Sequence, residues 1–425
     1  MKKNLWIAAA FAVLTLVSGC KSSGHAQNST DMRSLNAVVD SEPLDVLVDS
    51  DAKVSALPFG STSGYSEFDS GTRDVQVRSS TAQTILSDKS LSLSSGVNNT
   101  LLIYGKRASI LSQLITDDTT TASSGHFRIR VINLSPDTGP VDLYVTSGAI
   151  SSSGAIIPAA TFGTLTGAAE VTTGSFGVTL TTSGTQDILF QSTAQNFSDN
   201  STYTIVVLPS LGGKLVSVVL LTQGSNGSGT LLQNPFARVK AVNGIPDSTA
   251  LNFKADGTVL LSSVPFMGSS SYVTTAAGSR ALQIEASNVP GTNIASLTKQ
   301  LDPSRDYSAV AVGTLAAPQL VAFADDNSLP SSGFAKIRFA NALVGSAGAD
   351  VLLNFASQTT GLAFATASTY YQVAPSLTYT ITFATPGGVS VIATLTPAEL
   401  DASAVYTAYL FGTASSAQVK LVRDR

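Results

Sequence analysis

The chain has 425 residues, of which 43% are hydrophobic and 12% charged, and its formal net charge at pH 7 is −4. This acidic balance argues against a nucleic-acid partner, because proteins that bind polyanions carry an excess of basic residues. The apolar content is too high for a disordered chain, and the length allows several domains with cores of their own.

Residues 1–19 have the pattern of an export signal peptide. Lys2 and Lys3 give a basic start, residues 5–17 are apolar, and Ser18 and Gly19 form a small-residue cleavage site. The apolar run is shorter than the roughly 20 residues that a transmembrane helix needs. An ordinary secretory signal, followed by an incidental cysteine, is the alternative interpretation.

Cys20 is the only cysteine of the chain, so the exported protein has no disulfide framework. Residues 17–20, Val-Ser-Gly-Cys, resemble the lipobox of bacterial lipoproteins, in which the cysteine carries the lipid after cleavage. The resemblance implies lipid attachment at Cys20, a membrane partner and a cell-envelope location. Lys21, rather than Asp, follows the cysteine, which in enterobacterial lipoproteins resembles the signal for transfer to the outer membrane.

A polar segment, residues 20–31, is expected to form a flexible tether, and four repeats follow it. In the clearest repeat, two runs of alternating polar and apolar residues, 127–133 and 141–145, flank a loop rich in Pro, Gly and Asp. This pattern predicts a pair of strands. An Asn and an Asp or Asn stand nine residues apart on the two sides of this loop in every repeat: Asn36 and Asp45, Asn133 and Asp142, Asn243 and Asn252, Asn341 and Asp350.

Further landmarks recur downstream in register. A phenylalanine is followed after six positions by a tyrosine or, in the second repeat, by alanine: Phe59 and Tyr65, Phe162 and Ala168, Phe266 and Tyr272, Phe364 and Tyr370. Each repeat closes with an apolar run, at residues 99–104, 203–207, 307–312 and 406–410.

Together these patterns predict an all-β protein of tandem antiparallel, immunoglobulin-like β-sandwiches with about seven short strands each. The predicted domains are residues 32–116, 127–222, 236–324 and 334–425. The segments 117–125, 223–229 and 325–333 are poor in apolar residues and are the expected boundaries.

The stretch from Arg128 to Val145, with Ser-Pro-Asp before Val-Asp-Leu-Tyr-Val, resembles the opening of the bacterial domain-of-unknown-function family 4397. Residues 162–180 and 278–284 continue the likeness. The second and third repeats carry it best, whereas the first and fourth lack the Pro-Asp pair at this place. The resemblance implies tandem sandwiches in an exported protein and provides no catalytic residue.

Basic residues alternate with apolar ones on the first strand of three repeats: Arg128 and Arg130, Arg238 and Lys240, Lys336 and Arg338. This spacing predicts that the charges lie on the solvent face of the strand. There they would pair with Asp142 or Asp350, or protect a sheet edge against aggregation. The repeated Asn and Asp residues beside the loop are interpreted as turn-stabilising groups, with a ligand site as the alternative.

Residues that carry catalysis are scarce, so we predict a non-enzymatic protein without a cofactor or metal site. The only histidines are His25, in the tether, and His126, expected just before the second sandwich. The glutamates are spread over the repeats: Glu42, Glu67, Glu170, Glu285 and Glu399. An envelope hydrolase working with carboxylates alone is the least favoured alternative.

Acidic residues stand together at two expected boundaries, Asp117 with Asp118 and Asp325 with Asp326 and Asn327. We interpret them as solvated linker residues, with calcium binding as the alternative.

The favoured function is a structural or interaction role in the cell envelope, with an envelope protein or a glycan as partner. A glycan-binding module is the alternative, with Tyr65, Tyr144, Tyr272 and Tyr370 as binding platforms, because the only tryptophan, Trp6, leaves with the signal peptide. Periodic aromatic residues are, however, more often part of a core.

Overall fold

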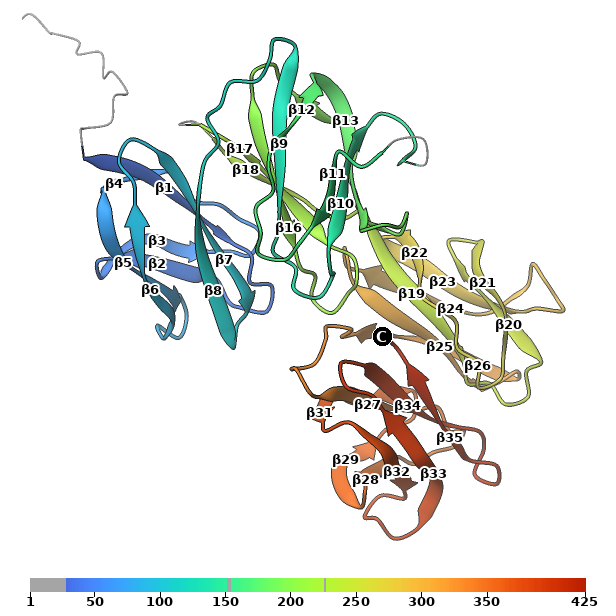
Figure 1. The fold of residues 1–425 in the computed structure, drawn as a ribbon. Helices are drawn as coiled ribbons and strands as arrows, with labels where there is room; N and C mark the ends of the chain where they lie inside the picture. Colours follow the sequence, from blue (N-terminus) through green and yellow to red (C-terminus); the bar gives the residue numbers. More distant parts are fainter. Residues whose placement is uncertain (1–27, 151–153, 225–226) are drawn as a thin grey trace, which may run out of the picture.

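The computed structural model describes residues 28–150, 154–224 and 227–425. The signal peptide, Cys20 and His25 lie outside these residues. The described chain forms four β-sandwich units in tandem (Figure 1), which confirms the predicted all-β class. Among the described residues, no helix is both long and apolar enough to cross a membrane.

Unit 1 has eight strands, close to the expected number of about seven. They are β1 (Ser29–Asn36), β2 (Leu44–Val48), β3 (Asp51–Leu57), β4 (Ser66–Asp69), β5 (Gly71–Ser79), β6 (Ile85–Leu93), β7 (Asn98–Lys106) and β8 (Ser109–Thr116). The first sheet has the order β4-β1-β7-β8 and the second β3-β2-β5-β6. β1 begins at Ser29, inside the segment expected to be a tether.

Unit 2 adds a short strand to each sheet. Its strands are β9 (His126–Asn133), β10 (Val141–Thr146), β11 (Ile157–Ala160), β12 (Ala169–Thr172), β13 (Gly174–Thr182), β14 (Ile188–Gln191), β15 (Gln195–Phe197), β16 (Thr202–Leu208), β17 (Ser217–Thr222) and β18 (Gly229–Leu232). β18 pairs with β17 and continues the first sheet ten residues beyond the expected end of the unit at residue 222.

Unit 3 repeats the topology of unit 1, with sheets β22-β19-β25-β26 and β21-β20-β23-β24. Its strands are β19 (Phe236–Asn243), β20 (Ala250–Ala255), β21 (Thr258–Pro265), β22 (Val273–Ala276), β23 (Gly278–Ala286), β24 (Asn293–Leu301), β25 (Asp306–Thr314) and β26 (Ala317–Asp325).

Unit 4 has the same plan, with its edge strand split into two short pieces. Its strands are β27 (Ala335–Asn341), β28 (Ala349–Leu353), β29 (Ala356–Leu362), β30 (Thr366–Ala367), β31 (Tyr371–Val373), β32 (Ser376–Ala384), β33 (Val391–Leu400), β34 (Val405–Phe411) and β35 (Gln418–Arg423). The first sheet contains β27, β34 and β35, and the second has the order β29-β28-β32-β33.

The sandwiches are not antiparallel throughout. In each unit the first strand pairs in parallel with the closing apolar strand, as β1 does with β7 and β9 with β16. The same pairing joins β19 to β25 and β27 to β34. All other neighbours of these strands are antiparallel, so a single parallel pair lies at the centre of each first sheet.

The closing strands are buried on both faces, which explains why their sequences are apolar without alternation. In β16, Ile205 and Val207 point into the core of unit 2, whereas Val206 and Leu208 belong to a separate cluster shared with unit 1. Parallel strands covered on both sides have this composition.

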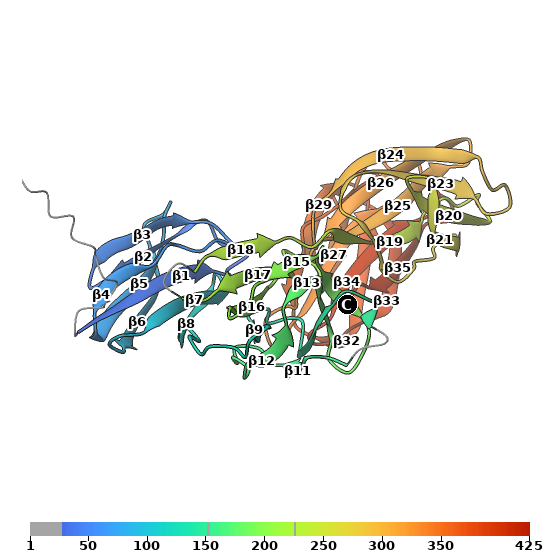
Figure 2. The same ribbon diagram turned by 90° about the horizontal axis from the view of Figure 1, so that it is seen from above.

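The units therefore pack in pairs, first sheet against first sheet. One apolar cluster joins units 1 and 2, with Leu35 and Leu102 against Ile132 and Val206. A second cluster joins units 3 and 4 through the equivalent strands, with Val242 and Val310 beside Tyr409. The recurring phenylalanines lie in or beside these clusters rather than in the four sandwich cores. Seen from above, unit 2 lies between unit 1 and the second pair (Figure 2).

Candidate functional site

One cation on the first strand of every unit is buried between paired sheets. Arg33, Arg130, Lys240 and Arg338 are at most 7% exposed, and each stands three residues before the recurring asparagine. The prediction of a solvent face for the last three was therefore wrong. Alternation correctly placed these side chains opposite the core of their own unit, but a second sheet covers that face.

The contacts between units 1 and 2 are reciprocal. Arg33 Nη1 donates to the backbone oxygen of Thr222 at 3.0 Å, and Arg130 Nη2 donates to that of Thr116 at 2.9 Å. Each acceptor ends the strand that follows the closing apolar strand of the opposite unit, β17 for Thr222 and β8 for Thr116. Contacts that run equally in both directions are the signature of two-fold packing, here between two units of one chain.

The junction between units 3 and 4 carries two ion pairs that cross it. Arg338 of unit 4 pairs with Asp325 of unit 3, and Lys240 of unit 3 pairs with Asp424 of unit 4. Both carboxylates accept a further hydrogen bond, from Ser308 at 2.7 Å and from Thr407 at 2.6 Å. None of the four charged side chains is more than 2% exposed.

The electrostatics of this junction keep Asp325 and Arg338 charged. Burial alone would raise the pKa of Asp325, but the adjacent Arg338 and Lys240 outweigh burial and hold it below its usual value. Burial likewise acts to lower the pKa of Arg338, and the charge of Asp325 overrides it, so that this pKa rises. Asp325 and Arg338 thus each remain charged in the buried junction because the partner from the other unit lies beside them.

The recurring tyrosines complete the junctions. Tyr65 donates its hydroxyl to Asp117, and Tyr272 donates to Asp325 at 2.5 Å. A cation of the same unit lies over each ring, with Arg33 4.8 Å from the Tyr65 centroid and Arg338 4.9 Å from that of Tyr370. Burial raises the pKa of the Tyr272 hydroxyl, so it remains a proton donor.

The cation contacts affect whether the tyrosines predicted as glycan-binding platforms can stack on a sugar. Tyr65, Tyr272 and Tyr370 each have one ring face covered by a cation. Tyr144 lies on β10 and is 9% exposed. A sugar would need such a ring face to be free. The rings belong to the junctions or the interior rather than to an open surface.

The interpretation of Asp117 and Asp325 as solvated linker residues was wrong. Asp117 lies 3.6 Å from Arg33, and neither side chain is exposed. Asp117 directly follows β8, and Asp325 is the last residue of β26. Both strands belong to the first sheets, so both acids lie at the junctions between paired sheets. Within the described residues, no group of three His, Cys, Asp or Glu side chains could hold a metal ion.

The loop-flanking asparagines bind backbone groups of their own unit. Asn36 Oδ1 accepts from the backbone N–H of Val38 at 2.9 Å, and its amide donates to Leu57 O at 3.0 Å. Asn243 and Asn341 make the same two kinds of contact, and Asn133 binds Ser135 and Gly139. These bonds hold the loop between the first two strands.

The second member of each pair supports a bulge in the adjacent edge strand. Asp45, Asp142, Asn252 and Asp350 each accept the backbone N–H of a residue with positive φ: Ala56, Ala159, Ser263 and Gly361, respectively. The strand register shifts beside each of these bulges. Their geometry is that of turn and bulge stabilisation.

Asp142 provides a pH-dependent prediction. Burial alone would raise the pKa of its carboxyl, but the N–H groups of Ala159 and Gly184 bind the charged form and lower the pKa overall. A group with a lowered folded-state pKa stabilises the fold above its unfolded pKa of about 3.9, and this contribution disappears as the pH falls through the folded value.

We therefore expect Asp142→Asn to reduce the free energy of unfolding at pH 7 and to make little difference at pH 2 to 3. Urea denaturation at both pH values measures the two losses. An equal loss at both would show that the charge of Asp142 contributes nothing.

His126 and the five glutamates, for which no catalytic role was predicted, lie on different elements of the fold. His126 is the first residue of β9, inside unit 2 rather than in a linker, and its Nδ1 lies 3.0 Å from Ser124 O. Glu42 pairs with Arg107, Glu170 with Arg128 and Glu285 with Lys254. Glu67 lies beside a surface hollow, and Glu399 is exposed on β33.

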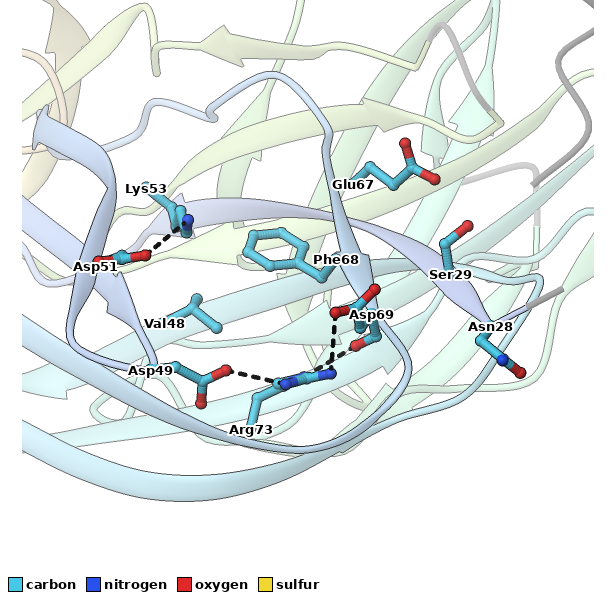
Figure 3. Close-up of a pocket in the computed structure, with 10 residues that line it drawn as sticks. All are labelled: Asn28, Ser29, Val48, Asp49, Asp51, Lys53, Glu67, Phe68, Asp69 and Arg73. Carbon is cyan, nitrogen blue, oxygen red and sulfur yellow. Dashed lines mark hydrogen bonds and ion pairs between the residues drawn. The ribbon is translucent and has the colours of Figure 1, made fainter. Parts of the chain in front are cut away.

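That hollow has a volume of about 430 Å³ and opens on unit 1, where the edge strands β3 and β4 of the two sheets face each other (Figure 3). Phe68 points into its middle, and Arg73 lies between Asp49 and Asp69, at 3.2 and 3.7 Å. Asp51 pairs with Lys53 at 3.4 Å. The hollow thus offers an aromatic ring surrounded by charged groups, most of which already pair with one another.

Comparison with known proteins identifies one protein family. The family model described as Domain of unknown function (DUF4397) matches residues 30–144, 237–347 and 335–425. The match therefore covers units 1, 3 and 4 and only the first two strands of unit 2. This differs from the expectation that the second repeat is among those that carry the resemblance best.

No curated protein matches the chain. Among solved structures, the Bacillus anthracis TIE protein is 9% identical, with 91% of this chain and 68% of that chain covered and a TM-score of 0.16. CBMbc (family CBM26) from Eubacterium rectale Amy13K, solved in complex with maltoheptaose, is 10% identical, with 48% and 98% covered and a TM-score of 0.17. With scores this low, no property of either protein is transferred.

Proposed function

The chain belongs to the family described as Domain of unknown function (DUF4397), and we propose that it is a non-enzymatic scaffold of the cell envelope, built from paired sandwiches. In this proposal a lipid on Cys20 anchors the scaffold in the membrane, most simply the outer membrane. The four units then present their second sheets and loops to a partner in the envelope.

The observation that carries this proposal is the reciprocal burial of cations between paired sheets. Arg33 and Arg130 cross one junction, and the ion pairs of Lys240 and Arg338 cross the other. Buried charges with one good partner disfavour any sliding or opening that separates them. Each pair of sandwiches therefore acts as one stiff body, which suits a protein that holds surfaces at a fixed distance from a membrane.

The non-enzymatic assignment is supported by composition and by the surroundings of the candidate groups. The whole sequence contains two histidines and one cysteine. Among the described residues, the recurring Asn and Asp side chains are engaged by backbone groups. The same residues that could attract a ligand are thus occupied in holding loops and bulges.

The anchor is tested by growing cells that express the full chain with labelled palmitate. We expect label in the wild-type chain and none in Cys20→Ser, because acylation requires the thiol. The wild-type chain should fractionate with membranes. A Cys20→Ser chain that is labelled equally would contradict the anchor.

The interaction role is tested with the chain from Lys21 onward, immobilised and exposed to an extract of the envelope. Specific retention of one envelope component is expected. Retention of nothing beyond what a second soluble protein retains would argue against the role.

Ligand or glycan binding is a second candidate function, favoured by the hollow on unit 1. Its volume falls within the range of about 300–1,000 Å³ typical of ligand sites, and Phe68 gives it an apolar surface. Saturable binding on a glycan array, lost in Phe68→Ala, would favour this function over the scaffold alone.

A further inference from the structure

The most exposed large apolar side chains of the described residues gather on one sheet. Phe355 is 82% exposed, Leu377 63%, Val389 84% and Val391 66%, whereas the other exposed large apolar residues reach at most 53%. All four belong to the second sheet of unit 4 or its turns. Phe355 and Leu377 lie towards one end of the sheet, and Val389 and Val391 lie at the other.

The surface between these two ends consists of small hydroxyl side chains. Thr382 and Thr394 face each other across β32 and β33 with hydroxyl oxygens 3.4 Å apart, and Leu352 extends the same row onto β28. Thr380 and Thr396 form the next row, 3.1 Å apart. The hydroxyls thus already satisfy part of one another's hydrogen-bonding capacity.

This surface carries no free charge near its centre. Asp350 is 8% exposed, and its oxygens accept the N–H groups of Gly361 and Gly387. The equivalent faces of two other units are charged, with Arg78 paired to Asp45 on unit 1 and Lys254 paired to Glu285 on unit 3. We call this surface, made by β29, β28, β32 and β33, the unit 4 face.

Among residues 28–150, 154–224 and 227–425, the contact between units 3 and 4 does not use the unit 4 face. Unit 4 packs on unit 3 through its first sheet, with Ala340, Tyr409 and Phe411 in the shared cluster. Figure 1 shows β28, β29, β32 and β33 on the side of unit 4 that is turned away from unit 3. A partner can therefore reach this face without disturbing the pairing of the units.

We propose that the unit 4 face binds a second copy of the chain, sheet against sheet, in a two-fold dimer. This inference rests on the proposed scaffold function and names its partner. Without Lys2 and Lys3 the 24 basic residues become 22 against 28 acidic ones, so two copies of the chain from Lys21 onward, each with a formal net charge of −6, repel one another over most of their surfaces. Glu399 is exposed at one end of β33, but the middle of the face, around Thr382 and Thr394, carries no unpaired charge. The repulsion is weakest there, and contact also removes the exposed apolar groups from water.

The chain already uses this mode of association twice, because both of its junctions join two sheets with reciprocal contacts. Closed two-fold contacts are the commonest form of self-association. A two-fold axis lying across the strands would place Phe355 of one copy over Val389 and Val391 of the other. The two apolar ends of the face then cover each other.

The area of the face predicts a weak, reversible dimer. Four strands at their usual spacing, each about eight residues long, give roughly 500 Å² per partner. The total of about 1,000 Å² lies at the lower limit of specific interfaces. Interfaces of this size are typical of weak, transient contacts, and membrane anchoring of both copies would raise the effective concentration.

Sedimentation equilibrium of the chain from Lys21 onward, which retains every described residue, tests the proposal. We expect a monomer–dimer equilibrium with a dissociation constant of about 1–100 µM. Thr382→Lys combined with Thr394→Lys should weaken the dimer at least tenfold, because two like charges per copy then face each other. Gln76→Lys, at the equivalent position of unit 1, should leave the constant unchanged.

A second variant guards against misfolding of the first. Phe355 is at a turn with positive φ and is largely exposed, so Phe355→Asn retains the backbone and the core while removing the apolar contact. It should weaken the dimer severalfold with an unchanged melting temperature.

A chain that stays monomeric at 500 µM, or a dimer insensitive to both variants, would overturn the proposal. So would a monomer that binds neutral polysaccharide or lipid vesicles through Thr382 and Thr394, since another occupant would then cover the face. Failure of palmitate labelling at Cys20 leaves this experiment unaffected, because the soluble chain lacks that residue.

Discussion

Replacing Asp325 by alanine is expected to lower the free energy of unfolding by about 3–5 kcal/mol, the range found when one partner of a buried ion pair is removed. The change leaves Arg338 buried without its carboxylate, and Ser308 and Tyr272 lose their acceptor. Calorimetry or urea denaturation at pH 7 measures the loss. It should appear in the transition that reports units 3 and 4.

A matched surface pair provides the control. Asp51 lies 3.4 Å from Lys53, but the two side chains are 78% and 38% exposed. Asp51→Ala should therefore cost less than about 1 kcal/mol. Equal losses in Asp325→Ala and Asp51→Ala would refute the argument that burial of the pair determines the effect.

A double variant separates charge from packing. Replacing Asp325 by Leu together with Arg338 by Met should recover most of the stability, because well-packed apolar residues often substitute for a buried pair without net loss. The two sheets would then keep only one of the two ion pairs that cross the junction, that of Lys240 with Asp424. We expect a stable junction with broader interdomain distances than in the wild-type chain, as measured between spin labels on units 3 and 4.

Gly213→Ala is expected to separate the two pairs of sandwiches from each other. A Cβ at this position would lie far inside contact distance of the Ser304 backbone oxygen and 2.9 Å from Ser210 Oγ. Ser304 belongs to the turn before β25 and donates to Val216 O at 3.3 Å, so this contact joins unit 2 to unit 3. Because the nearest obstacle is backbone, a side-chain rotation cannot relieve it.

We expect a cost of about 1–3 kcal/mol, as in other overpacked sites, together with an increase in the radius of gyration measured by X-ray scattering. The protection of amides within β16 and β25 against hydrogen exchange should persist, since the cores of the units are untouched. Gly167→Ala serves as the control, because nothing lies within 4 Å of its added Cβ. An unchanged scattering profile in Gly213→Ala would contradict this account of the contact.

The sequence was sufficient to predict the all-β class and the tandem sandwiches. Alternation in residues 127–133 and the turn residues that follow specify a strand pair through local rules. The recurring asparagine at nine residues from its partner marks the same loop in each unit. Alternation does not encode strand direction, however, so the parallel pairing of β1 with β7 could not be predicted from it.

The burial of Arg130 and Arg338 was missed for a physical reason. Alternating charges on a strand show only that the charges lie opposite the core of their own unit. Whether water or another sheet covers that face depends on contacts between residues far apart in the chain, such as Arg130 and Thr116 O. The closing strands carried the useful signal. Ile205, Val206 and Val207 are consecutive apolar residues, so both faces of β16 are apolar, which indicates that a second sheet covers the outer face.

The same reasoning applies to Asp117 and Asp325. Each stands where a run of polar residues begins, and short polar runs are typical of linkers. The tyrosines Tyr65 and Tyr272, six residues after the recurring phenylalanines, bind these acids. Recognising that connection requires the sheet order, which brings β4, the edge strand that directly follows Tyr65, beside β1.

The position of β1 inside its sheet determines how unit 1 responds to a mechanical load. β1 has β4 on one side and β7 on the other, and the chain enters it at Ser29. A pull on the preceding segment acts along the strand axis, so the ladders to both neighbours are sheared together rather than opened one bond at a time. Tension transmitted from an attachment before Ser29 would therefore load two ladders at once in the first strand that it reaches.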